Sequence, residues 1–82
     1  MKKYEIKSRW DGRVLFSLET DSLKSCVESA VAEGANLRGA NLEGADLRGA
    51  NLTRAYLKGA YLGGANLTDA YLEGADLEKS TS

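Results

Sequence analysis

The 82-residue sequence contains no histidine, no proline and a single cysteine, Cys26. Without histidine, a catalytic cysteine would lack its usual activating base, and the commonest metal ligand is missing. One cysteine permits no intramolecular disulfide, which suits a reducing cytoplasm. No stretch approaches membrane-spanning length, and Met1-Lys2-Lys3 leads into alternating polar residues instead of an apolar signal core. The sequence therefore predicts a cytoplasmic, non-enzymatic protein without cofactor or metal.

A five-residue repeat occupies residues 35–79. In all nine units the first residue is Ala and the third is Leu, and in six the fifth is Gly. Residues five apart share no face of an α-helix or of a straight strand, so a buried leucine column requires one chain turn per unit. Glycine suits such a corner because it tolerates unusual φ angles. The predicted core consists of Leu37, Leu42, Leu47, Leu52, Leu57, Leu62, Leu67, Leu72 and Leu77.

Tandem A(N/D)LxG units resemble the pentapeptide-repeat family. The resemblance implies an all-β solenoid, a right-handed quadrilateral β-helix with one unit on each side. Residues twenty apart would then stack, with Leu37 over Leu57 and Leu57 over Leu77. Small members from bacteria and their phages similarly carry a short non-repeat N-terminal segment, so the resemblance suggests a phage or prophage origin.

Residues 1–34 are predicted to cap the first coil, beginning with a β-hairpin. Asp11-Gly12 separates two alternating runs and is typical of hairpin turns. A two-residue loop would put Ile6 and Phe16 on opposite faces of the hairpin, so we favour a three-residue loop over residues 10–12. That loop leaves Leu15 as an exposed exception. It gathers on one face Tyr4, Ile6, Val14, Phe16 and Leu18.

A helix is predicted to complete this cap. Thr20, Asp21 or Ser22 can cap its N-terminus, and it runs to about Glu33. Cys26 lies on its apolar side and is expected to be buried. The remaining apolar positions on that side are Leu23, Val27, Ala30 and Val31. The predicted organisation is one folded unit, with a ββα cap over 1–34, the β-helix over 35–79 and a tail over 80–82.

The C-terminal coil is predicted to form an end-to-end homodimer. Only Ser80, Thr81 and Ser82 follow the last unit, too few residues for a helix or hairpin cap. Members of the family often pair two subunits through such ends, which implies contact through residues 66–79 here. In the alternative, polar residues screen the end of a monomer.

Three tyrosines, Tyr56, Tyr61 and Tyr71, replace Asn or Asp at an outward position of the repeat. On a four-sided coil they fall on three sides, and the sides of Tyr56 and Tyr61 adjoin. Tyrosine offers a large contact area at a binding surface, so these residues are candidates for contact with an unidentified protein partner. The structural alternative is that each ring packs over a corner glycine or on the asparagine above it.

The net charge is −1, but the charges are unevenly placed, and residues 59–82 carry one basic and four acidic side chains. The candidate acidic patch consists of Asp69, Glu73, Asp76 and Glu78. Some family members protect DNA gyrase by imitating duplex DNA with a long, strongly acidic rod, whereas this chain is short and nearly neutral. A DNA mimic that inhibits a host gyrase or antiviral nuclease is therefore the second hypothesis, behind a protein-interaction module. The simplest alternative is that these charges only solvate the surface.

Direct binding to nucleic acid is disfavoured. The hairpin carries basic residues that could form one face with Trp10, but a nearly neutral chain attracts phosphate weakly. These residues are Lys2, Lys3, Lys7, Arg9 and Arg13.

Overall fold

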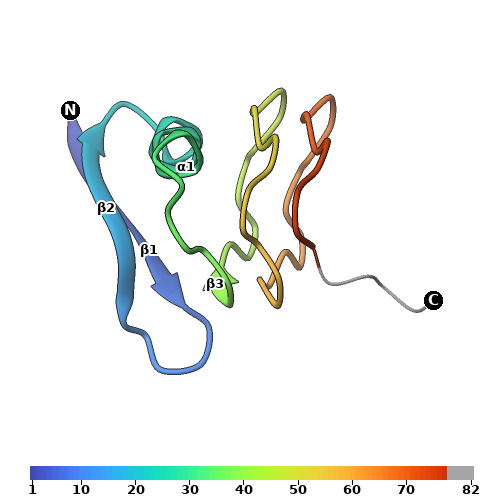
Figure 1. Ribbon diagram of the computed structural model, residues 1–82. Helices are drawn as coiled ribbons and strands as arrows, with labels where there is room; N and C mark the ends of the chain where they lie inside the picture. Colours follow the sequence, from blue (N-terminus) through green and yellow to red (C-terminus); the bar gives the residue numbers. More distant parts are fainter. Residues whose placement is uncertain (78–82) are drawn as a thin grey trace.

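The computed structural model describes residues 1–77 and consists of a hairpin, a helix and a coiled segment in sequence order (Figure 1). Glu78 of the acidic patch and the predicted tail lie outside the described residues. Helix α1 lies between the hairpin and the coils that follow it. The elements are β1 (Lys2–Ser8), β2 (Val14–Thr20), α1 (Leu23–Ala32) and β3 (Ala40–Asn41).

Strands β1 and β2 pair antiparallel, with Tyr4 opposite Leu18 and Ile6 opposite Phe16. These four side chains share one face, as the alternation predicted. On its other edge β1 pairs antiparallel with the short β3, where Ser8 lies opposite Ala40. The sheet order is therefore β2-β1-β3, and the hairpin is hydrogen-bonded directly to the first coil.

The prediction for the hairpin tip is wrong. The Ser8 N–H donates to the Arg13 carbonyl at 2.8 Å, so residues 9–12 form a loop one residue longer than expected. A bulge compensates, because Lys7 pairs with Val14 while Ile6 pairs with Phe16, and Leu15 is the extra residue. Because of this extra residue, the side chains of Val14 and Leu15 point to the faces opposite to those predicted. Val14 is consequently 43% exposed, and Leu15 is partly buried against the core.

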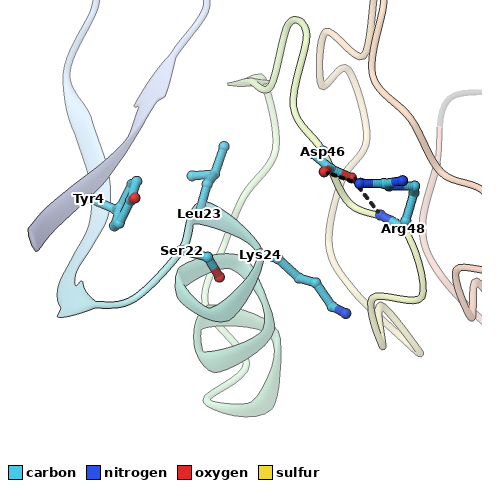
Figure 2. Close-up of a pocket in the computed structure, with 6 residues that line it drawn as sticks. All are labelled: Tyr4, Ser22, Leu23, Lys24, Asp46 and Arg48. Atoms are coloured by element: carbon cyan, nitrogen blue, oxygen red, sulfur yellow. Dashed lines mark hydrogen bonds and ion pairs between the residues drawn. The ribbon is translucent and has the colours of Figure 1, made fainter. Parts of the chain in front are cut away.

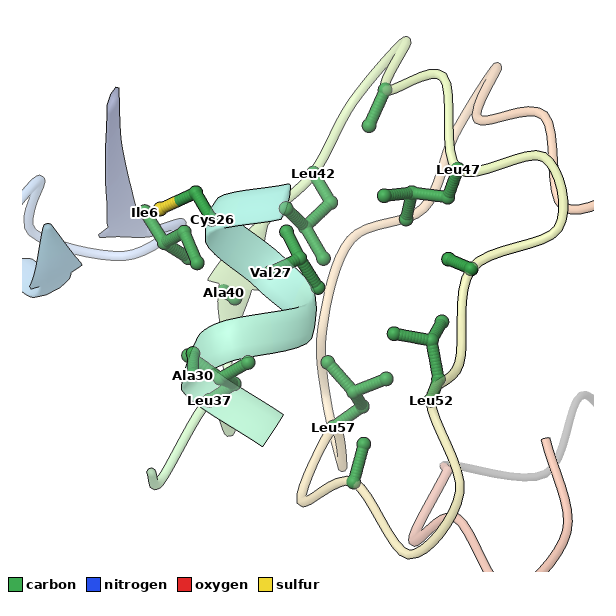
Figure 3. Packing of buried hydrophobic residues seen from close by; sticks show 13 residues of the cluster. Ile6, Cys26, Val27, Ala30, Leu37, Ala40, Leu42, Leu47, Leu52 and Leu57 are labelled. Atoms are coloured by element: carbon green, nitrogen blue, oxygen red, sulfur yellow. The ribbon is translucent and has the colours of Figure 1, made fainter. Parts of the chain in front are cut away.

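Helix α1 has the capping and the buried face that the sequence predicted. Ser22 is the N-cap, and its hydroxyl accepts the N–H of Ser25 at 3.1 Å. Cys26, Val27 and Ala30 are fully buried. Figure 3 shows Cys26 beside Ile6 of β1, whereas Val27 points toward the leucines of the coil. The helix therefore packs between β1 and the first coil and covers the apolar interior of that coil.

From residue 35 onward, the chain stacks on itself every twenty residues. Parallel bridges join the second residues of units that are four units apart, so four units complete one turn. Leucine N–H groups make the rungs, as from Leu37 to the Tyr56 carbonyl at 3.1 Å. The bridged pairs are Asn36–Tyr56, Asn41–Tyr61, Asp46–Asn66, Asn51–Tyr71 and Tyr56–Asp76.

The leucines point inward into one continuous core. Those covered on both sides are fully buried, namely Leu37, Leu42, Leu47, Leu52 and Leu57. Those of the last described turn are only partly buried, namely Leu62, Leu67, Leu72 and Leu77. Stacking of coils, and not any single unit, therefore removes the leucines from water.

Candidate interaction surface

We call each stack of bridged units a wall and the turn at the fifth residue of a unit a corner. The corner at Gly39 and Gly59 joins the wall that carries Tyr56 to the wall that carries Tyr61. The two glycines are stacked, because the Gly39 N–H donates to the carbonyl of Lys58 at 3.0 Å. Trp10, from the hairpin loop, lies against both. A Cβ atom added at Gly39 would overlap the indole ring, and one at Gly59 would lie 3.4 Å from its Cη2. Both glycines have positive φ angles, 73° and 76°, which favour glycine, and at Gly39 the ring also leaves no room for a Cβ atom.

Arg9 fixes the hairpin loop on the same corner. Its backbone N–H donates to the Gly39 carbonyl at 2.7 Å, and its Nη1 donates to the Gly59 carbonyl at 3.0 Å. The guanidinium also lies 5.1 Å from the ring centroid of Tyr61, within the range of a cation–π contact. One arginine of the cap thus contacts both coils.

Arg38 makes a similar contact on the adjoining wall. Its guanidinium lies 4.9 Å from the ring centroid of Tyr56. Its Nη2 lies 3.2 Å from Oδ2 of Asp76, and its Nη1 donates to Oδ1 of Asn36 at 3.4 Å. The arginine therefore lies along the outer column formed by Asn36, Tyr56 and Asp76 and neutralises the carboxylate at its end.

Despite these contacts, much aromatic surface stays in solvent. Trp10 is 70% exposed, Tyr56 43% and Tyr61 39%. We call these three side chains, together with Arg9 and Arg38, the aromatic corner. Exposed aromatic side chains flanked by arginine are the composition that protein-binding surfaces favour.

The third tyrosine lies elsewhere. Tyr71 bridges to Asn51 on a wall that does not border the Gly39 corner, and it is 60% exposed. No arginine lies over its ring within residues 1–77. The structure thus brings together two of the three predicted tyrosines.

The sequence did not connect the hairpin loop with the tyrosines. It offered Arg9 and Trp10 only as part of a basic hairpin face. A tryptophan inside a predicted three-residue loop was the available signal that its ring contacts something outside the hairpin.

The acidic residues are divided between walls. Asp69 occupies a corner with a φ of 61°, and Glu73 follows on the wall of Tyr71. Asp76 lies on the wall of Tyr56, where Arg38 neutralises it. Among the described members of the acidic patch, only Asp69 and Glu73 are therefore without an ion-pair partner in residues 1–77.

A groove of about 540 Å³ lies between the start of α1 and the coil (Figure 2). Two of its charged side chains pair, because Arg48 donates to Asp46 through Nε and Nη2, both at 2.9 Å. This pairing lowers the pKa of the Asp46 carboxyl and raises the pKa of Arg48. The groove is lined by Tyr4, Ser22, Leu23, Lys24, Asp46 and Arg48.

The described residues contain no group of three or more His, Cys, Asp or Glu side chains placed to hold a metal ion. Burial raises the pKa of the Cys26 thiol, which disfavours the reactive thiolate. Across residues 1–77, no helix has both the length and the apolar character needed to cross a membrane.

Comparison with known protein families agrees with the twenty-residue stacking. A model of pentapeptide repeats matches residues 28–54 and 45–81, with eight copies of the repeat. Searches of curated proteins and of solved structures gave no match. Such repeats imply a β-helix-type fold, and proteins built from them generally serve as non-enzymatic structural or interaction modules. Because the matches cover more than half of the sequence, this chain belongs to the pentapeptide-repeat family.

Proposed function

We propose that this protein is a non-enzymatic interaction module that binds a protein partner at the aromatic corner. The observation that carries the proposal is the exposure of Trp10, Tyr56 and Tyr61 at one corner of the coil. Tryptophan, tyrosine and arginine dominate the residues whose truncation weakens protein–protein complexes most. The backbone around the corner is held by hydrogen bonds from both the cap and the coil, so little ordering is needed on binding.

The proposal includes a specific architecture and compartment. The repeat would form a closed, right-handed quadrilateral β-helix, with residues 1–34 as its ββα cap. An experimental structure would test both features. The cytoplasm is the proposed compartment, where the buried thiol of Cys26 would stay reduced.

Partner capture with matched tyrosine variants tests the binding proposal. Tagged native protein, the Tyr56→Ser/Tyr61→Ser variant and the Tyr71→Ser variant would be incubated with bacterial lysate, and retained proteins quantified by mass spectrometry. We expect a partner that the double variant loses and the Tyr71→Ser variant keeps. Equal retention by all three would contradict binding at the corner, provided that circular dichroism shows each variant folded.

The DNA-mimic alternative makes a different prediction in the same assay. A variant with Asp69, Glu73, Asp76 and Glu78 neutralised to amides should lose a DNA-binding partner, whereas the tyrosine variants should keep it. The pairing of Asp76 with Arg38 weakens this alternative, since it reduces the negative charge available to imitate phosphates.

We also propose that two copies pair end to end through the last coil. Support comes from the partial burial of Leu62, Leu67 and Leu72, compared with full burial of Leu47 one turn earlier. Analytical ultracentrifugation over a range of concentrations would test it. A monomer mass at every concentration would contradict pairing.

A further inference from the structure

We propose that the aromatic corner recognises an acidic segment of its partner, in which a carboxylate side chain neighbours an apolar one. This inference rests on the proposed function and goes further, because it names the chemistry of the partner. It also assigns direct contacts to Arg9 and Trp10, two residues of the cap that lie outside the repeat.

The charges around the corner are predominantly positive. Arg9, Arg13, Arg38 and Lys58 stand against two carboxylates, Asp76, which pairs with Arg38, and Asp11, which follows Trp10 in the loop and accepts the backbone N–H of Arg13. Asp76 is paired with Arg38, so its charge is already compensated. Arg9 has no carboxylate partner within residues 1–77. The corner therefore complements a negative partner segment.

Arg9 retains donors for such a segment. Its guanidinium carries five N–H groups, and one of them, on Nη1, is used by the Gly59 carbonyl. The guanidinium carbon lies 5.1 Å from the centroid of the Tyr61 ring, and the other four N–H groups donate to no acceptor within residues 1–77. A carboxylate can therefore approach the edge of Arg9 and accept charge-assisted hydrogen bonds without disturbing the cap.

Trp10 supplies the apolar half of the recognition. It follows Arg9 in sequence, and the hydrogen bond from the Arg9 N–H to the Gly39 carbonyl holds the loop on the coil. The six-membered ring of the indole lies against the corner glycines, while Trp10 stays 70% exposed. A charged donor and an apolar surface thus lie side by side, which fits a carboxylate next to an aliphatic or aromatic residue.

The same features fit single-stranded nucleic acid less well. Proteins that bind single-stranded nucleic acid stack its bases on open aromatic faces along a strongly positive groove. Here arginines already lie over Tyr56 and Tyr61, at 4.9 and 5.1 Å from the ring centroids. The net charge of −1 gives little general attraction to phosphate.

Selection from a library of short random peptides tests the inference. Peptides enriched on the immobilised protein would be labelled, and their affinities measured by fluorescence anisotropy. We expect the enriched peptides to contain Asp or Glu beside an apolar residue, and their affinity to fall with increasing salt. The salt series uses native protein alone, so it gives a result even where a variant fails to fold.

Two variants with the same change of charge separate the corner from general electrostatics. Arg9→Gln should weaken peptide binding roughly tenfold, the effect of losing one hydrogen bond to a charged group. The backbone N–H of residue 9 still donates to the Gly39 carbonyl in this variant, so the cap should stay docked. Arg48→Gln, on a wall away from the corner, should leave the affinity unchanged.

Four results would overturn the inference. Enriched peptides without carboxylates, whose binding still requires Tyr56 and Tyr61, would refute the acidic chemistry and leave the proposed function standing. Equal loss of affinity in both arginine variants, or no enrichment at all, would remove the corner as an acidic-peptide site. Binding of an oligothymidine probe that Arg9→Gln abolishes, in place of peptide binding, would favour nucleic acid and contradict both proposals.

Discussion

Alanine at Gly39 should destabilise this protein much more than alanine at Gly44, although both glycines have the same backbone conformation. Their φ angles are 73° and 68°, in the left-handed region that is unfavourable for alanine. This backbone effect should cost about 1 kcal/mol at either position. The difference lies in the space beyond the backbone, since no atom lies within 4 Å of a Cβ added at Gly44, whereas the Trp10 ring occupies that space at Gly39.

The extra cost follows from displacement of Trp10. Because this side chain is 70% exposed, it buries about 75 Å² of the roughly 250 Å² that a tryptophan can bury. At about 25 cal/mol per Å², this contact contributes about 2 kcal/mol. Gly39→Ala should therefore cost about 3 kcal/mol in all, compared with about 1 kcal/mol for Gly44→Ala.

Thermal unfolding followed by circular dichroism measures the difference. At roughly 4–8 °C per kcal/mol for a chain of this size, Gly39→Ala should melt about 10 °C below Gly44→Ala. In a Trp10→Ala background the two alanine variants should melt together, because the ring is gone. Trp10 is the single tryptophan, so its fluorescence would report release of the ring directly. Equal melting temperatures in the native background, or a gap that persists without Trp10, would show that the ring does not cause the difference.

Three further predictions concern the coil and the cap. Arg54→Gly should raise the melting temperature by roughly 4–8 °C, because arginine is held there at a φ of 64°, which is unfavourable for any residue with a Cβ atom. An unchanged melting temperature would show that contacts of the arginine side chain offset this backbone cost. In denaturant titrations, Leu47→Ala should lower the free energy of unfolding by about 3 kcal/mol and Leu72→Ala by about half as much. The difference is expected because Leu47 is fully buried and Leu72 only partly buried. Cys26 should react with a thiol reagent at neutral pH only as fast as the cap opens, since the residue is buried and its thiol pKa is raised; rapid alkylation of the folded protein would contradict the packing of α1.

Much of the fold was predictable because its signals are local. Capping residues at 20–22 followed by apolar positions at helical spacing located α1, and the alternation correctly put Ile6 and Phe16 on one face. The tip of the hairpin was not predictable in the same way. A three-residue loop and a longer loop with a bulge at Leu15 both place Ile6 and Phe16 on the same face, so the alternating pattern does not distinguish them. The contact between the hairpin tip and the coil does.

The candidate site was predictable only in part. Tyr56 and Tyr61 stood out as deviations within the repeat, and their adjoining walls followed from four units per turn. Their arginine partners did not follow, because Arg9 lies about fifty residues away from Tyr61 and no local pattern connects them. The acidic patch was grouped by its nearness in sequence, whereas Arg38 compensates Asp76 across the coil.

The coil follows from local sequence, because every five-residue unit carries its own inward leucine and, in most cases, its own corner glycine. Tertiary structure alone decided which corner of that coil the cap would contact. Docking of β1 beside β3 brings Trp10 to Gly39, and the same docking carries Arg9 to Gly59 and Tyr61. The repeat is nearly the same on every wall, so its four corners become different only when the cap packs against one of them.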